Sequence, residues 1–123
     1  MPGQKILVVD DELRVVLLFT DVLVEQGYEV IKASNATEGM MLFLEDPEIE
    51  LVITDLQMPP WMEFGRQMLS QRPGTKMILV TGLDGSREVV EQALLEVGFQ
   101  TVLIKPVDIE ILIGAVKRVL EAP

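Results

Sequence analysis

The chain has 123 residues, of which 49% are hydrophobic and 24% are charged, as expected for one globular domain and not for a disordered segment. It contains no cysteine and no histidine, which excludes disulfides, zinc–thiolate sites and histidine-based acid–base catalysis. The net charge of −10 disfavours a nucleic-acid partner, and the absence of a long apolar run or a signal peptide predicts a cytoplasmic protein outside the membrane.

Five runs along the chain have the composition of β-strands. They occupy residues 5–9, 28–33, 51–54, 76–80 and 101–104. The first and third runs are uninterrupted apolar segments, which is typical of strands buried on both faces of a parallel sheet.

Each strand is followed by a segment with helical spacing of apolar residues or with helix-capping residues. We predict helices over residues 13–26, 35–44, 66–71, 86–97 and 108–120. Asn35 and Glu38 resemble a capping box, Ser86 and Asp108 are candidate N-caps, and Gly98 is a candidate helix end. Five strand–helix units with right-handed crossovers predict a doubly wound α/β fold, with one parallel sheet covered on both faces, for a single domain of residues 1–123.

Polar residues follow four of the five predicted strands. They are Asp10, Asp11, Asp55, Thr81 and Lys105. Because the carboxyl ends of parallel strands share one edge of the sheet, we expect these residues to converge on one crevice.

The chemistry of this group follows from its charges. Three carboxylates in one crevice repel each other unless a cation neutralises them, and an all-oxygen ligand set favours Mg²⁺. Lys105 suits an anionic phosphoryl oxygen, the Thr81 hydroxyl is a donor, and the Gly82 N–H can be approached closely. A carboxylate nucleophile with these partners is the set required to form an aspartyl phosphate.

The chain resembles the receiver domains of two-component response regulators over essentially its whole length. The shared motifs are Asp10-Asp11 after the first strand, Asp55-x-x-Met58-Pro59 after the third, Thr81 after the fourth, and Lys105-Pro106 after the fifth. The resemblance implies a flavodoxin-like strand order, 2-1-3-4-5, and a cis peptide bond between Lys105 and Pro106.

The resemblance also implies a function and a set of roles. Asp55 would accept a phosphoryl group from a histidine kinase or a His-phosphotransfer protein, and Lys105, Thr81 and the Gly82 N–H would hold the phosphoryl oxygens. Asp11, Asp55 and the Gln57 carbonyl would bind Mg²⁺ directly, with Asp10 acting through water. A downstream partner, or a second copy in a dimer, would use the fourth helix, fifth strand and fifth helix.

The sequence departs from the family pattern in three places. The loop after Asp55 is longer, and we expect it to continue to Gly65 with Trp61 as a hydrophobic anchor. Phe99 stands where the family usually has alanine, and Val102 replaces the usual aromatic switch residue. A stiff valine predicts a muted change on the fifth strand and a larger displacement in residues 82–86.

Other interpretations remain open at this point. Asp10 and Asp11 could be acidic residues of a helix N-terminus, Asp55 could be a turn residue, and Met40 and Met41 could fill the core or an interface. A Mg²⁺-dependent phosphohydrolase is an alternative function, although it needs a second carboxylate where Gln57 stands. A pseudo-receiver that only binds protein partners is another.

Overall fold

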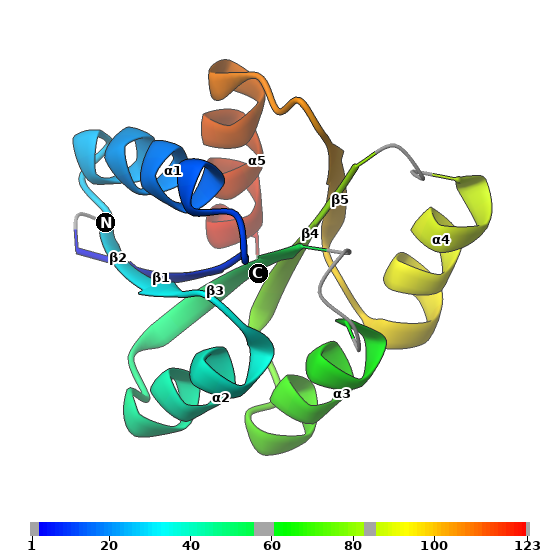
Figure 1. Ribbon diagram of the computed structural model, residues 1–123. Helices are drawn as coiled ribbons and strands as arrows, with labels where there is room; N and C mark the ends of the chain where they lie inside the picture. The colour runs from blue at the N-terminus through cyan, green and yellow to red at the C-terminus, as the bar shows by residue number, and fades with distance from the viewer. Residues whose placement is uncertain (1–2, 56–60, 83–85, 123) are drawn as a thin grey trace.

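The sheet is parallel and has five strands in the order β2-β1-β3-β4-β5, as predicted (Figure 1). The computed structural model describes residues 3–55, 61–82 and 86–122. The strands are β1 (Lys5–Val9), β2 (Glu29–Ala33), β3 (Ile49–Asp55), β4 (Lys76–Thr81) and β5 (Thr101–Ile104).

Helices cover both faces of this sheet. The helices α1 (Leu13–Glu25) and α5 (Ile109–Glu121) lie on one face, whereas α2 (Ala36–Glu45), α3 (Trp61–Gln71), α4 (Arg87–Glu91) and the π-helical η1 (Gln92–Val97) lie on the other (Figure 1). Alternation along β1 divides the core accordingly: Ile6 and Val8 pack in the cluster under α1 and α5, and Leu7 and Val9 in the opposite one. The sheet is therefore buried on both faces, which explains the uninterrupted apolar runs.

The predicted capping residues begin their helices. The Asn35 side chain accepts a hydrogen bond from the Glu38 N–H, and Glu38 Oε1 accepts one from the Ser34 N–H, a close variant of the capping box. The Ser86 side chain accepts a hydrogen bond from the Val89 N–H at the start of α4. The Asp108 side chain accepts one from the Glu110 N–H at the start of α5.

The start of α3 was predicted wrongly. The helix begins at Trp61, not at Arg66, so the loop after Asp55 does not extend to Gly65. Trp61, Phe64 and Met68 have the i, i+3, i+7 spacing of a helix face and pack against one core cluster. The longer loop was expected because the segment from Met58 to Gly65 exceeds the usual family motif by about two residues.

The segment after α4 also differs in detail from the single α-helix that was predicted. From Gln92 the chain forms a π-helical turn, in which the Gly98 N–H donates to the Ala93 carbonyl five residues earlier. Gly98 has φ 109°, a left-handed conformation that glycine adopts without a Cβ clash. The Phe99 N–H then donates to the same carbonyl, and the Phe99 side chain turns into the core.

Gly65 of α3 has no side chain and so leaves room for the bulky Phe99. A Cβ on Gly65 would lie 2.8 Å from Val97 Cγ1 and 3.0 Å from Phe99 Cε2, closer than carbon atoms pack. The Trp61 ring covers the same phenylalanine, with ring centroids 6.0 Å apart and a tilt of 54°. Trp61 is therefore part of the packing between α3 and the end of η1, not a loop anchor.

We predict that Gly65→Ala destabilises the fold by about 1–3 kcal/mol because the added methyl overpacks this contact. Helix propensity alone predicts the opposite sign, a gain of up to about 1 kcal/mol. Gly114→Ala is the matched control, since a Cβ on this α5 glycine meets nothing within 4 Å. Urea denaturation of both variants measures the difference, and a Gly65→Ala protein as stable as Gly114→Ala would contradict the packing described.

Candidate functional site

Strand register brings the predicted site residues to one edge of the sheet. Asp55 is the last residue of β3 and Thr81 the last of β4, and Thr81 is paired with Ile104 of β5. The Lys105 N–H extends this ladder by donating to the Thr81 carbonyl at 2.7 Å, and the Asp10 N–H donates to the Ala33 carbonyl beyond β1. The carboxyl ends of β1, β3, β4 and β5 thus lie together at one edge of the sheet, as expected.

Lys105 is the cation at the centre of the site. Its Nζ lies 2.9 Å from Asp55 Oδ2, 3.4 Å from Asp10 Oδ2 and 3.7 Å from Glu12 Oε1. Asp10 and Asp55 are both buried, and burying a carboxylate without a partner is costly. The Lys105–Pro106 peptide bond is cis, as predicted.

The titration of Asp10 and Lys105 reflects burial and charge. Burial raises the pKa of Asp10 to about 6; the charge of Asp55 adds to this, while the Glu12 N–H and Lys105 oppose it. Burial by itself lowers the pKa of Lys105, but its hydrogen bond to Asp55 and the charges of both aspartates outweigh that effect and leave the pKa raised. Lys105 is therefore a stable cation at neutral pH.

The three aspartates form a cluster that suits a hard divalent cation. One carboxylate oxygen from each of Asp10, Asp11 and Asp55 lies within 4.8 Å of the other two. With all three ionised, the Lys105 ammonium leaves two negative charges uncompensated, and the donor set contains only oxygen. These residues fit Mg²⁺, which needs few protein carboxylates and retains several waters. The predicted ligand Gln57 lies outside the described residues.

Thr81 has a hydroxyl at the carboxyl end of β4 that is unpaired within the described part of the chain. Its side chain is fully buried, and its Oγ1 has no hydrogen-bond partner within residues 3–55, 61–82 and 86–122. A buried hydroxyl normally has a partner, so this one is suited to a group that enters the site. Gly82 follows it and is half-buried.

Glu12 and an adjacent apolar hollow were not identified from the sequence. Glu12 is the N-cap of α1; its N–H donates to Asp10 Oδ1 at 2.8 Å, and its carboxylate faces Lys105. A hollow of about 420 Å³ lies beside Lys105, and its lining residues are Glu12, Val15, Leu18, Phe19, Gly82, Lys105, Pro106 and Val107. The position of Glu12 next to Asp11 was its only signal in the sequence, and the hollow had none because it joins three distant segments.

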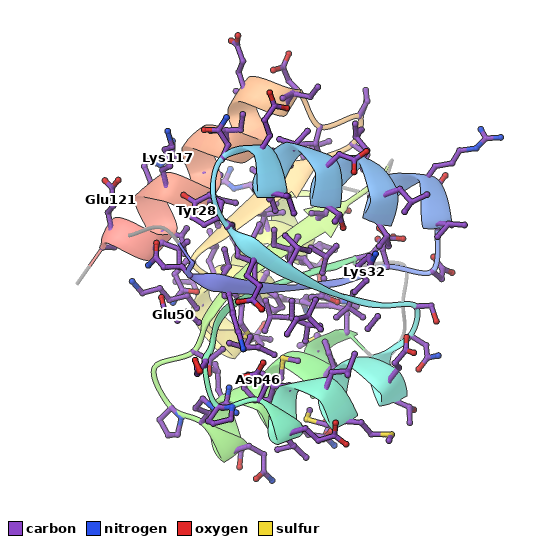
Figure 2. The ribbon with its side chains drawn as sticks, turned by 90° about the vertical axis from the view of Figure 1, so that its left-hand side faces the viewer. Tyr28, Lys32, Asp46, Glu50, Lys117 and Glu121 are labelled. Carbon is purple, nitrogen blue, oxygen red and sulfur yellow. The ribbon has the colours of Figure 1, made fainter. Side chains whose placement is uncertain are left out.

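Charged contacts at the amino edge of the sheet hold the fold together, unlike those of the candidate site. Lys5 pairs with Asp46, labelled in Figure 2, at 2.9 Å. The Arg72 guanidinium lies 4.0 Å above the Phe43 ring and donates to the carbonyls of Phe43 and Ile49. These contacts join chain segments and satisfy backbone carbonyls, so they serve the fold.

Comparisons with known proteins agree with the fold and the site. The sequence profile of the response regulator receiver domain matches residues 6–117. A probable chemotaxis protein CheY of Rhizobium etli is 33% identical, with 96% of this chain and 93% of the relative covered. Sporulation initiation phosphotransferase F of Bacillus subtilis is 27% identical over 98% of this chain and 96% of its own. The crystal structure of a receiver domain protein from Clostridium thermocellum is 34% identical and superposes with a TM-score of 0.86 over 94% of this chain and 93% of its own.

The chain belongs to the response regulator receiver domain family. It is a signalling module of the two-component type with a flavodoxin-like fold. Receiver domains also occur inside larger proteins: the sensor kinase/phosphatase CqsS of Vibrio cholerae matches this chain at 32% identity over only 17% of its own length. In the described part of the chain, no helix has the length and apolar composition needed to cross a bilayer.

The raised pKa of Asp10 predicts how stability changes with pH when Mg²⁺ is absent. The folded protein binds this proton more tightly than the unfolded chain, whose aspartates titrate near 3.8, so the contribution is present below about pH 4 and lost as pH rises through about 6. Asp10→Asn should remove this loss, whereas Asp21→Asn on the exposed surface of α1 should retain it. Urea denaturation in EDTA across that range measures both; equal pH dependence in all three proteins would contradict the shift.

Proposed function

We propose that this receiver takes a phosphoryl group onto Asp55 from the phosphohistidine of a histidine kinase or a His-phosphotransfer protein, in a reaction that requires Mg²⁺. The observation that carries the proposal is the position of Asp55, which pairs with Lys105 at 2.9 Å and clusters with Asp10 and Asp11. The family and the relative named as a sporulation phosphotransferase are consistent with this role.

The transfer exchanges one phosphorus bond for another. A carboxylate oxygen of Asp55 attacks phosphorus, and the O–P bond forms as the P–N bond to the donor imidazole breaks. The imidazole nitrogen keeps the electron pair and then binds a proton from water. Lys105 holds a phosphoryl oxygen by charge, and the Thr81 hydroxyl, otherwise without a partner in the described residues, donates to another. The Gly82 N–H supplies a further donor.

The aspartates would hold the metal. Asp11 and Asp55 would bind Mg²⁺ directly together with the Gln57 carbonyl, and Asp10 would act through water. When bound, Mg²⁺ offsets the negative charge that accumulates between these carboxylates and the phosphoryl oxygens. Asp10 and Asp55 also keep the Lys105 ammonium at the phosphoryl side of the crevice.

Two surfaces are suited to protein partners in this scheme. A protein that delivers a phosphohistidine to Asp55 must cover the mouth of the site, and the apolar hollow beside Lys105 lies there. The output face would be α4, η1, β5 and α5, where Leu95 and Ile104 are exposed apolar residues. That face would serve a downstream protein or a second copy. Val102 is half-buried against the core, so the signal to this face would pass through other residues.

Acetyl phosphate with Mg²⁺ should add a single phosphoryl group to the wild-type protein, and Asp55→Asn should abolish the adduct by removing the nucleophile. Intact-mass spectrometry measures this directly. Asp21→Asn is the control with the same chemical change on the surface. An unmodified wild-type protein would favour the pseudo-receiver, and repeated turnover of unrelated phosphate esters would favour the phosphohydrolase.

Mg²⁺ should stabilise the folded protein because it binds the assembled cluster and not the unfolded chain. The expected gain is about 1 kcal/mol or more when Mg²⁺ is several times its Kd, and it should appear as a higher melting temperature. Asp11→Ala should remove most of the gain, and Asp21→Ala should leave it intact. A melting temperature that does not respond to millimolar Mg²⁺ would contradict the metal site.

A further inference from the structure

A second hollow lies between α2 and α3, which contact each other on the same face of the sheet (Figure 1). Its volume is about 370 Å³, and it lies on helices that contribute none of the carboxylates, the threonine or the lysine of the phosphorylation site. Its main lining residues are Met40, Met41 and Leu44 of α2 and Glu63, Phe64 and Gln67 of α3. We call this feature the α2–α3 groove.

The groove has an apolar floor and, on its α2 side, an exposed apolar wall. Phe64 is buried and Met40 packs against the core, as a core-filling methionine should. Met41 and Leu44 are different: they are 57% and 52% exposed, one helical turn apart on the same side of α2. A single exposed apolar residue needs no explanation, but two beside a hollow lined by the buried Phe64 make a contiguous apolar surface. Methionine is flexible and polarizable, which suits contact with a foreign apolar side chain.

Charge around the groove selects the kind of partner. Glu38 and Glu45 flank Met41 at helical spacing on α2, and Glu63 lines the opposite wall on α3; all three are exposed. Helix α2 contains no lysine or arginine, and no basic residue lines the groove. An apolar groove with an acidic rim complements an amphipathic helix that carries lysine or arginine beside its apolar stripe.

The same charges disfavour the other occupants. Nucleic acid and anionic lipid would be repelled by the rim, and a second copy of this chain would bring a further net charge of −10 toward it. We propose that the α2–α3 groove is a docking site for a basic amphipathic helix of another protein. This site does not depend on phosphorylation of Asp55, so it stands or falls separately from the proposed function.

The test uses the unmodified chain without phosphodonor or Mg²⁺. The probe is a synthetic leucine–lysine peptide of about four helical turns with its leucines on one face. A peptide of identical composition, with the leucines spread around the helix, controls for charge alone. Methyl NMR of the methionines reports the location, because Met40 and Met41 line the groove while Met68 and Met77 are fully buried. Shifts at Met40 and Met41 with the amphipathic peptide, and much weaker binding of the control, are expected.

Substitutions then test the contact. Met41→Ser with Leu44→Ser should weaken binding about tenfold or more, because apolar anchors dominate such interfaces. The matched control is Leu13→Ser with Leu17→Ser, which removes two exposed apolar side chains one turn apart on α1. Glu63→Lys should weaken binding more than Glu25→Lys, the same charge change on α1. Equal binding of the two peptides, unmoved Met40 and Met41 signals, equal losses in test and control variants, or a preference for anionic vesicles would each overturn the proposal.

Discussion

The site depends on one charge contact, the 2.9 Å pair between Lys105 and the buried Asp55. A single ammonium cannot compensate Asp10, Asp11 and Asp55 together, and this imbalance defines what the crevice can accept. In the proposed function, Mg²⁺ and a phosphoryl group are complementary additions, because the metal would offset carboxylate charge while Lys105 and Thr81 would meet phosphoryl oxygens. Burial is the main cause of the raised pKa of Asp10, and the charge of Asp55 adds to it.

The parallel sheet holds the three carboxylates close together despite their repulsion. Its strands are buried on both faces, so their hydrogen-bonded register fixes the position of each strand end. The Lys105 N–H donates a hydrogen bond to the Thr81 carbonyl and so links the end of β5 to the end of β4. The Glu12 N–H donates to Asp10 Oδ1 and links the start of α1 to the end of β1. The repulsion between carboxylates is therefore balanced by packing far from the site, as happens at many functional centres.

Because strand ends are local signals, sequence reasoning predicted that Asp10, Asp11, Asp55 and Lys105 meet at one edge of the sheet. An apolar run followed by Asp55 or by Lys105 reveals both the strand and the side chain at its carboxyl end, and strand order followed from the family resemblance. Reasoning from the sequence failed where the decisive contact lies between segments that are far apart in the chain. The early start of α3 at Trp61 and the need for Gly65 both follow from packing against Phe99, which no local window contains. Glu12 was missed for the same reason, because Lys105 approaches it only in the fold.

The central claim is that the carboxylate paired with Lys105, and no other, carries the phosphoryl group. Borohydride reduces an acyl phosphate to an alcohol and so marks the modified aspartate permanently as homoserine. Peptide mapping of protein treated with acetyl phosphate and then with borohydride should place homoserine at position 55 alone. Homoserine at Asp10, Asp11 or a surface carboxylate, with Asp55 unchanged, would contradict the account.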